Sequence, residues 1–377
     1  MMKKMIALLL ALVLCLTMFT GCSKENTEDT AQTPAVLDYD GAFAKYDPET
    51  VVMTINGDEV SWSEFYYMLY SAVSQLQYYL GDMDWDEECM EGYGTTFEEY
   101  SMQLTMDSIK QFHAIEKKSK DMGISLTDED LTRIEENEKA FKIQNCGEEA
   151  TDEAFNAFLL ENFYLTNDVY EFVNRNSVLY EKLFLESVGV NGEKVSDTDI
   201  EDFIARAPYV TTKHILLMTV DSQTGEALSK DEIKQAEETA KQLLEQLKGI
   251  PERDTLVSTF DTLMQEYNED PGVKLFPNGY TFTKGQMYEV FEQAAFALEE
   301  YQISDIVESE AGYHILLRLP TTRESLVDFD YENNRYYTVE TYAMTDIYSK
   351  LISSWMDECE ISWSKEFEDI TAEKFFS

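Results

Sequence analysis

Two short stretches of the chain, Lys213-His214-Ile215-Leu216 and Gly312-Tyr313-His314-Ile315-Leu316, decide how its second half folds. Each stretch places a histidine near the start of an apolar run, as in a β-strand. Side chains two positions apart lie on the same face of a strand, so each histidine shares a face with the leucine that follows it. The pattern therefore predicts two strands that each carry a histidine on the same face as Leu216 or Leu316.

Helical patterns separate these two strands. Ser229-Lys230-Asp231-Glu232 matches a capping box, which predicts the start of a long helix. A second helix is expected around 256–267 and a third from about 287 to 298, because apolar residues recur there at helical spacing. Strands and helices in this order predict a compact α+β domain over 207–320, with helices packed against an antiparallel sheet.

The folded chain opens with a hairpin pattern. Val51 to Ile55 is a strand-like apolar run, and Asn56-Gly57 is a dipeptide that favours a tight turn. Ser61 and Glu64 then have the spacing of a capping box, which predicts a helix directly after the hairpin.

The chain outside 207–320 has mainly helical periodicity. It predicts a helical domain over 48–206, and helical spacing returns in the segment 321–377. That segment is too short to fold alone, so we expect it to pack on the helical domain. The α+β domain would then be an insertion in a mostly α-helical one.

The N-terminus has the features of an export signal. Lys3 and Lys4 precede an apolar run that is too short to span a membrane as a helix, which predicts a signal peptide over 1–21. Phe19-Thr20-Gly21-Cys22 resembles the bacterial lipobox, and this resemblance implies that Cys22 is lipidated and becomes the new N-terminus. Polar residues after it predict a flexible tether over 22–47. An ordinary signal peptide that contains a cysteine is the alternative.

The composition excludes one class of partner. The 29 basic and 74 acidic residues give a net charge of −45. Binding to phosphate backbones needs clustered Lys and Arg, so we expect no nucleic-acid partner. Hydrophobic residues make up 44% of the chain, which is too many for a disordered protein.

The remaining cysteines and the third histidine indicate neither a metal site nor a cofactor. Cys89, Cys146 and Cys359 are odd in number and widely spaced, which argues against a disulfide framework and a zinc site. Structural or free thiols are expected, and one disulfide is left open. His113 is interpreted as a core or boundary residue of a helix, because apolar residues surround it in the sequence.

Several motifs together resemble a known family. Ile55-Asn56-Gly57-Asp58-Glu59-Val60 and Gly123-Ile124-Ser125-Leu126-Thr127 resemble the N-terminal domain of PrsA- and SurA-like foldases. From Val210 to Pro320 the chain resembles a parvulin, or rotamase, domain. The residues that carry this second resemblance are Lys213-His214-Ile215-Leu216, Gly285-Gln286-Met287, Phe291-Glu292-Gln293-Ala294-Ala295-Phe296 and Gly312-Tyr313-His314-Ile315-Leu316.

The parvulin resemblance implies a set of site residues. His214 and His314 would face each other at the back of the site, with Asp270 between them and the substrate and Ser309 hydrogen-bonding toward them. The proline ring of the substrate would lie in an apolar pocket formed by the side chains of Phe282, Met287 and Phe291. The chain departs from the family at Gly279, where a pocket-lining Leu is usual, so we expect reduced activity.

The family resemblance implies a peptidyl-prolyl cis-trans isomerase and chaperone for exported proteins. Its partners would be unfolded or partly folded proteins with X–Pro bonds, and its lipid anchor would hold it to the outer face of the cytoplasmic membrane. A homodimer is left open. The main alternative is a non-catalytic holdase with a degenerate parvulin domain, which the altered pocket loop favours. A solute-binding lipoprotein is a weaker alternative that the parvulin motifs argue against.

Overall fold

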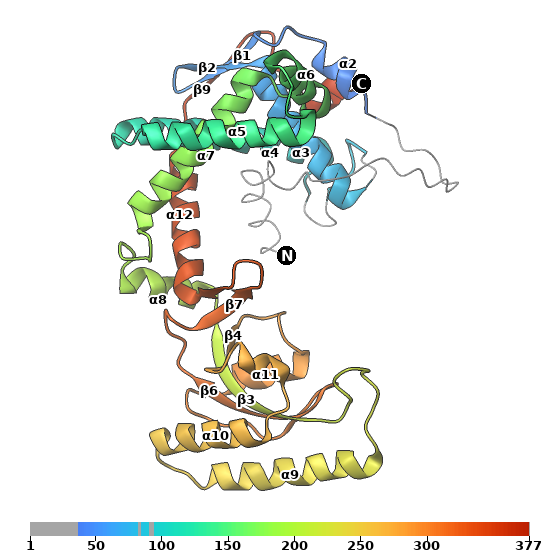
Figure 1. The fold of residues 1–377 in the computed structure, drawn as a ribbon, viewed down its shortest axis with the longest axis vertical. Helices are drawn as coiled ribbons and strands as arrows, with labels where there is room; N and C mark the ends of the chain where they lie inside the picture. Colours follow the sequence, from blue (N-terminus) through green and yellow to red (C-terminus); the bar gives the residue numbers. More distant parts are fainter. Residues whose placement is uncertain (1–36, 82–83, 90–93, 377) are drawn as a thin grey trace, which may run out of the picture. The chain divides into compact units, whose positions relative to one another are not determined.

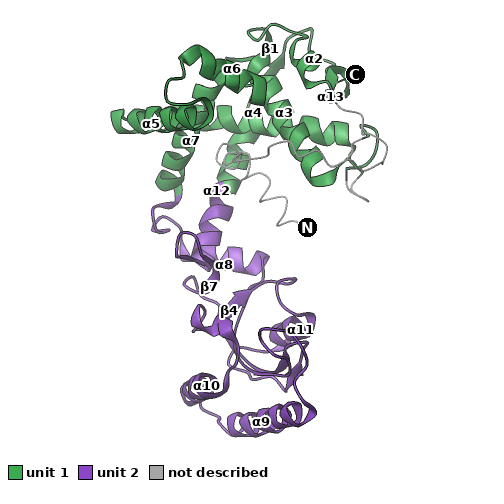
Figure 2. Ribbon diagram, turned by 45° about the vertical axis from the view of Figure 1, so that its right-hand side comes forward, with its two compact units in different colours: residues 1–187, 349–377 green, residues 188–348 purple. Residues whose placement is uncertain are grey.

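The computed structural model describes residues 37–81, 84–89 and 94–376, so the predicted signal peptide and Cys22 lie outside the described residues. The chain divides into two compact units, 1–187 with 349–377 and 188–348 (Figure 2). We call them unit 1 and unit 2. No helix within the described ranges is long and apolar enough to cross a membrane.

Unit 1 contains a three-stranded antiparallel sheet. Strand β1 (Val51–Ile55) pairs with β2 (Asp58–Ser61) on one side and with β9 (Ile361–Trp363) on the other. The predicted hairpin is confirmed, because Asn56 and Gly57 adopt positive φ values of 54° and 90° in its two-residue turn. The C-terminal part of the chain thus adds a strand next to the first one.

Unit 1 has an aromatic core to which its helices contribute most of the side chains. Its largest fully buried side chains include Trp62, Phe65, Tyr66, Phe155 and Phe367. Figure 1 shows how these helices are arranged. The helices are α2 (Tyr39–Phe43), α3 (Trp62–Leu80), α4 (Phe97–Asp121), α5 (Asp128–Cys146), α6 (Asp152–Phe163), α7 (Asn167–Val188), which ends at the first residue of unit 2, and α13 (Ala372–Phe376). Helix α12 (Val339–Asp357) begins in unit 2 and ends in unit 1.

Two details of unit 1 correct the sequence predictions. Residues 39–43, assigned to the tether, form helix α2, because Asp38 caps it and Ala42 is buried in the core. The Ser61 side chain accepts from the Glu64 amide as expected, but the Glu64 carboxylate does not complete the capping box and instead contacts His113.

Among the described cysteines, Cys89, Cys146 and Cys359 form no disulfide.

Unit 2 is built around a four-stranded antiparallel sheet with the order β4-β3-β6-β5. A separate hairpin, β7–β8, follows it in the chain. The strands are β3 (Val210–Met218), β4 (Tyr280–Phe282), β5 (Val307–Glu308), β6 (Gly312–Leu319), β7 (Leu326–Asp330) and β8 (Arg335–Thr338). The helices are α8 (Asp197–Arg206), α9 (Lys230–Lys248), α10 (Arg253–Tyr267), the 3₁₀ helix η1 (Pro271–Lys274) and α11 (Glu289–Ala297).

The two faces of this sheet pack against different helices. On one face, Ile215 and Ile315 belong to a core cluster with residues of α9 and α10, among them Leu243 and Phe260. On the other face, Leu316 packs with Phe282 of β4 and with side chains of α11. Alternation along β3 and β6 therefore places the two histidines on the α11 side.

The structure corrects two predicted elements of unit 2. The third helix begins at Glu289 and not at Met287, because 284–287 form a turn and a bend in which Gly285 has φ 84°. The Glu292 carboxylate accepts from the amides of Gly285 and Gln286 and holds this turn. The strand expected over 303–307 is reduced to an isolated bridge at Ile303 and the short strand β5.

Candidate active site

The two histidines of β3 and β6 are diagonal neighbours on one face of the sheet. The register pairs His214 with Leu316 and Leu216 with His314, so the histidines lie two positions apart across the strand pair. Their ring centroids are 5.4 Å apart, and the rings are inclined at 72°. Only 7% of His214 and 3% of His314 is exposed to solvent. The strand pairing therefore buries both imidazoles side by side.

The loop after α10 brings Asp270 to this pair. Asn268 Oδ1 accepts from the Leu216 amide at 2.8 Å, which fastens the loop to β3. Asp270 caps the 3₁₀ helix η1 and accepts from the Gly272 amide at 2.9 Å. Its Oδ2 atom lies 3.3 Å from Nε2 of His214. The carboxylate thus contacts His214, one member of the histidine pair.

Tyr280 is a site residue that sequence reasoning missed. Its hydroxyl donates to Asp270 Oδ2 at 2.5 Å, and its ring stacks on the His214 imidazole with an interplanar angle of 11°. Gly272 makes room for it, because a Cβ at that position would collide with the Tyr280 hydroxyl. Alternation in β4 was the available signal, since Tyr280 lies two positions before Phe282 and so on the same face.

Asp270 and His314 have different charge states at neutral pH, because their surroundings shift both pKa values downward. Burial raises the pKa of the Asp270 carboxyl, but interactions with His214, Tyr280 and the Gly272 amide outweigh it and lower that pKa to about 2. Burial, together with the neighbouring His214, lowers the pKa of His314 to about 4. Ser309 Oγ lies 2.7 Å from His314 Nε2. At neutral pH the site therefore holds a carboxylate anion beside a neutral His314.

Aromatic side chains form the apolar part of the site. The Phe291 ring lies 5.3 Å from each of the two histidine rings and 5.9 Å from Phe282. Phe282 and Phe291 are buried, and Met287 packs half-buried against the same cluster. Because Met287 lies in the turn before α11, its position depends on that turn and not on a helix face.

Gly279 has a backbone role in this structure. Its φ is +101°, and a Cβ at this position would lie 2.6 Å from the carbonyl oxygen of Thr212. The close approach of β4 to β3 leaves no room for a side chain there. A pocket-lining leucine at 279 would therefore require a different path of the chain, and the neighbouring Tyr280 reaches the site instead.

The comparisons with known proteins agree with this geometry. Residues 214–319 match the family described as rotamase, PPIC-type PPIase domain. The chain is 26% identical to the foldase protein PrsA of Halalkalibacterium halodurans over 82% of its own length and 71% of that protein. It is 24% identical to the foldase protein PrsA of Caldanaerobacter subterraneus over 95% of its own length and 94% of that protein.

Solved structures give a weaker likeness. A crystal structure of peptidylprolyl isomerase PrsA from Bacillus cereus matches at 20% identity over 83% of this chain and 87% of that one, with a TM-score of 0.26. The sequence matches therefore carry the assignment. Residues 214–319 form a parvulin-type rotamase domain, within a chain that is a homologue of PrsA foldases along most of its length.

Proposed function

We propose that this chain is a peptidyl-prolyl cis-trans isomerase that assists the folding of exported proteins. The observation that carries the proposal is the buried pair of His214 and His314, with the Asp270 carboxylate at its edge and the Phe282–Phe291 cluster beside it. The rotamase family match over 214–319 supports the same activity.

The reaction is a rotation about the X–Pro peptide bond. Its barrier of about 18–20 kcal/mol exists because the planar amide is stabilised by resonance, which rotation must break. No covalent bond is formed or cleaved, so the reaction needs no nucleophile. An enzyme accelerates it by binding the twisted amide more tightly than the planar one.

The charge arrangement of the site suits this task. In the planar amide, resonance places partial negative charge on the carbonyl oxygen. A fixed carboxylate near that oxygen destabilises the planar form relative to the twisted one, and the low pKa of Asp270 keeps the carboxylate ionised. The proline ring would contact Met287 and the edge of the cluster formed by Phe282 and Phe291. Ser309 and His314 would hold the polar network in place.

The helical part of the chain is proposed to hold unfolded clients. We assign this role to 48–206 with 321–377, as distinct from the isomerase domain over 207–320. We further propose that Cys22 carries a lipid anchor and that the protein acts at the outer face of the cytoplasmic membrane, since the N-terminal sequence resembles a lipoprotein signal.

The proposal is tested by measuring isomerisation of a proline-containing peptide with the mature chain. Asp270→Asn keeps the size of the side chain but removes its charge, so kcat/KM is expected to fall by about tenfold or more, a change of about 1.4 kcal/mol or more. Glu245→Gln, an exposed charge change on α9, is the matched control and should leave the rate unchanged. A folded wild-type protein that suppresses client aggregation without any isomerase activity would identify a holdase.

A further inference from the structure

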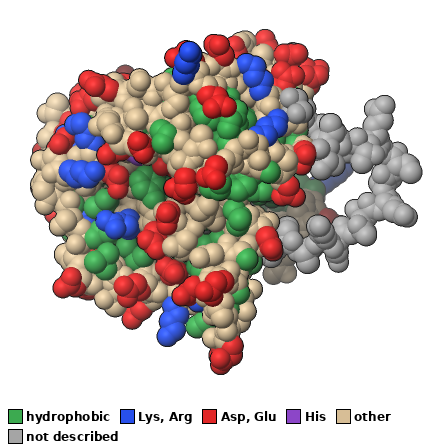
Figure 3. Space-filling view, turned by 90° about the horizontal axis from the view of Figure 1, so that it is seen from above, with side chains coloured by type: hydrophobic (Ala, Val, Ile, Leu, Met, Phe, Trp, Pro, Cys, Tyr) green, Lys and Arg blue, Asp and Glu red, His purple; other side chains and the backbone are tan. Residues whose placement is uncertain are grey.

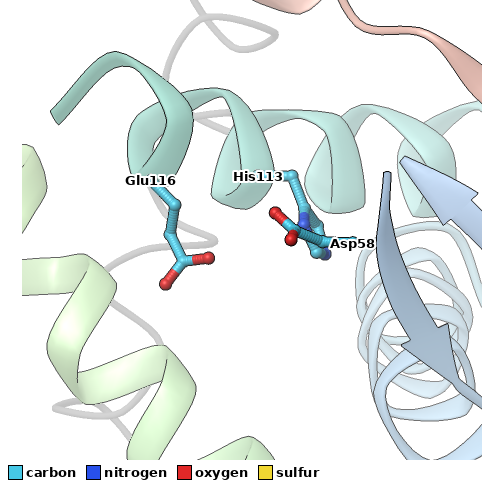
Figure 4. Close-up of side chains that lie close together, drawn as sticks. All are labelled: Asp58, His113 and Glu116. Atoms are coloured by element: carbon cyan, nitrogen blue, oxygen red, sulfur yellow. The ribbon is translucent and has the colours of Figure 1, made fainter. Parts of the chain in front are cut away.

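A second group of polar side chains lies in unit 1, outside the isomerase domain. His113 and Glu116 project from the same side of α4, and the carboxylate of Asp58 from the start of β2 lies beside the imidazole (Figure 4). One possible ligand atom from each of the three residues lies within 4.8 Å of the other two. The spacing of His113 and Glu116 accounts for their proximity, because residues three apart are neighbours on a helix surface.

The state of His113 indicates that one of its nitrogens is available to a ligand. Its Nε2 donates to Oε1 of Glu64 at 2.9 Å, and only 4% of the residue is exposed. Its Nδ1 is buried and has no hydrogen-bond partner. Burying a polar atom without a hydrogen-bond partner costs about 1–3 kcal/mol of stability. An unpaired atom of this kind therefore needs an explanation, such as a bound ion.

Glu64 gives a second indication. Its position in α3 predicts a capping box with Ser61, but its carboxylate contacts His113 instead. A carboxylate that accepts from one imidazole nitrogen orients the ring and leaves the other nitrogen as an acceptor. The imidazoles that bind metals in proteins have this arrangement.

These side chains line a cavity of about 310 Å³ in unit 1. Its lining is acidic, with Glu49, Glu59, Glu64, Glu116 and Asp168 as well as Asp58, while Lys120 is the cation that lines it. The Lys120 ammonium group lies 3.8 Å from Asp58 Oδ2, and both side chains are more than half exposed. An exposed ion pair of this length is weak, so a cation of higher charge can displace Lys120 from the carboxylate.

We propose that Asp58, Glu116 and Nδ1 of His113 bind a divalent transition-metal ion such as Zn²⁺, with Glu64 orienting the imidazole. We infer a transition-metal ion because one of the ligands is a nitrogen atom, whereas Ca²⁺ and Mg²⁺ prefer oxygen ligands alone. Three protein ligands leave a coordination position for water or for a donor group of a client. A bound ion would also link the hairpin of β1 and β2 to α4 and so stabilise unit 1.

The sequence led us to expect no metal site in this chain. Asp58 is far from His113 and Glu116 in the sequence, and this spacing has no motif signature. The hairpin and α4 both pack on α3, and this tertiary arrangement brings the three side chains together.

The test is Zn²⁺ titration of the full mature chain by calorimetry in the presence of excess Mg²⁺. The chain carries 74 acidic residues, and Figure 3 shows Asp and Glu side chains distributed over the visible face. Excess Mg²⁺ occupies such surface carboxylates and leaves a site with a nitrogen ligand for Zn²⁺. We expect one Zn²⁺ ion to bind per chain even when Mg²⁺ is in excess. Its binding should increase the thermal stability of the protein.

Variants separate this site from the general acidity of the surface. Asp58→Asn and Glu116→Gln, both at accessible positions, should each lower the affinity for that Zn²⁺ by about tenfold or more, and Glu64→Gln by about 10–100-fold. Glu149→Gln, an exposed charge change elsewhere in unit 1, is the control and should have no effect. With Co²⁺ as a spectroscopic probe, the visible absorption band should be lost in His113→Gln.

The opposite results would overturn the proposal. Zn²⁺ binding that Mg²⁺ abolishes, or equal Zn²⁺ affinity in Glu116→Gln, Asp58→Asn and Glu149→Gln, would show that the cation binds only to the acidic surface. If His113→Gln does not fold, the two carboxylate variants and the Mg²⁺ competition still decide the question.

Discussion

The hydroxyl group of Tyr280 donates a hydrogen bond to Oδ2 of Asp270 across 2.5 Å. This bond links strand β4 to the loop after α10, and both residues also contact His214. Tyr280 therefore acts as a positioning residue. Together with His214 and the Gly272 amide, it holds the carboxylate and lowers its pKa.

Replacing Tyr280 with Phe is expected to raise the pKa of Asp270 from about 2 toward its ordinary value. The variant keeps the ring that stacks on His214 and loses only the hydroxyl. A hydrogen bond to a charged group contributes about 1.5–3 kcal/mol, which sets the expected loss of stability. The pKa can be followed by NMR of the Asp270 side chain. Tyr288→Phe, at an exposed residue before α11, is the control, and equal pKa values of Asp270 in all three proteins would contradict the role of Tyr280.

Acid should destabilise unit 2 in two steps. In the folded protein His314 is neutral down to a pKa of about 4, whereas an unfolded histidine takes up a proton near pH 6.5. Between these values the unfolded state binds more protons, so stability falls as the pH falls, by a total on the order of 3 kcal/mol. Asp270 has a lowered pKa, and its contribution is lost only at lower pH, from about 3.8 to about 2.

NMR titration of the three histidines checks the first of these steps directly. The His314 ring should remain neutral at pH 5, and a His314→Asn variant assigns its signal. An imidazole of His314 that is protonated near pH 6.5 would contradict the prediction.

Met287→Ala is expected to reduce isomerisation with a small effect on stability. The side chain is half-buried against the Phe282–Phe291 cluster, so its loss should cost about 1 kcal/mol, less than the 2–5 kcal/mol typical of a fully buried position. Val290→Ala, at a 45% exposed position of α11, is the matched control. Peptide isomerisation at equal folded fractions is the measurement, and equal rates in the two variants would mean that the proline ring binds elsewhere.

Gly279→Ala should destabilise unit 2 strongly. The substitution places a Cβ against the Thr212 carbonyl and also requires a φ of +101° from an alanine. Gly225→Ala serves as the control because Gly225 has φ +71° and no atom near the added Cβ. In the control, the free energy of unfolding should fall only by the conformational cost of about 1–2 kcal/mol. In Gly279→Ala it should fall by more, because the added Cβ also collides with Thr212. Thermal unfolding of both variants measures the difference. Equal losses of stability would show that β4 can move away from β3 at little cost.

Cys22→Ala is expected to release the protein from the membrane or to leave the signal peptide uncleaved. The reason is the resemblance of Phe19-Thr20-Gly21-Cys22 to a lipobox behind a basic and apolar leader. Membrane fractionation and the mass of the N-terminal peptide give the answer. If the variant is processed normally and remains attached to the membrane, the prediction of a lipid anchor at Cys22 is wrong.

Local patterns in the sequence predicted much of this protein. Alternation around His214 and His314 predicted two strands in which each histidine shares a face with Leu216 or Leu316, and strands β3 and β6 confirm it. Asn56-Gly57 and Ser229 predicted a turn and a helix start that the structure contains. These signals are readable because turns, caps and strand faces depend on residues only a few positions apart.

Only the tertiary structure decided which distant groups meet. Tyr280 reaches Asp270 because Gly279 lets β4 approach β3 and Gly272 leaves space for the hydroxyl. Likewise, Glu64 leaves its expected capping role because α4 presents His113 to it. Such contacts join residues far apart in the chain, and their energies depend on burial and on the space left by neighbours. A local pattern carries no information about either quantity, so the charge state of the isomerase site and the acidic cavity of unit 1 followed from packing alone.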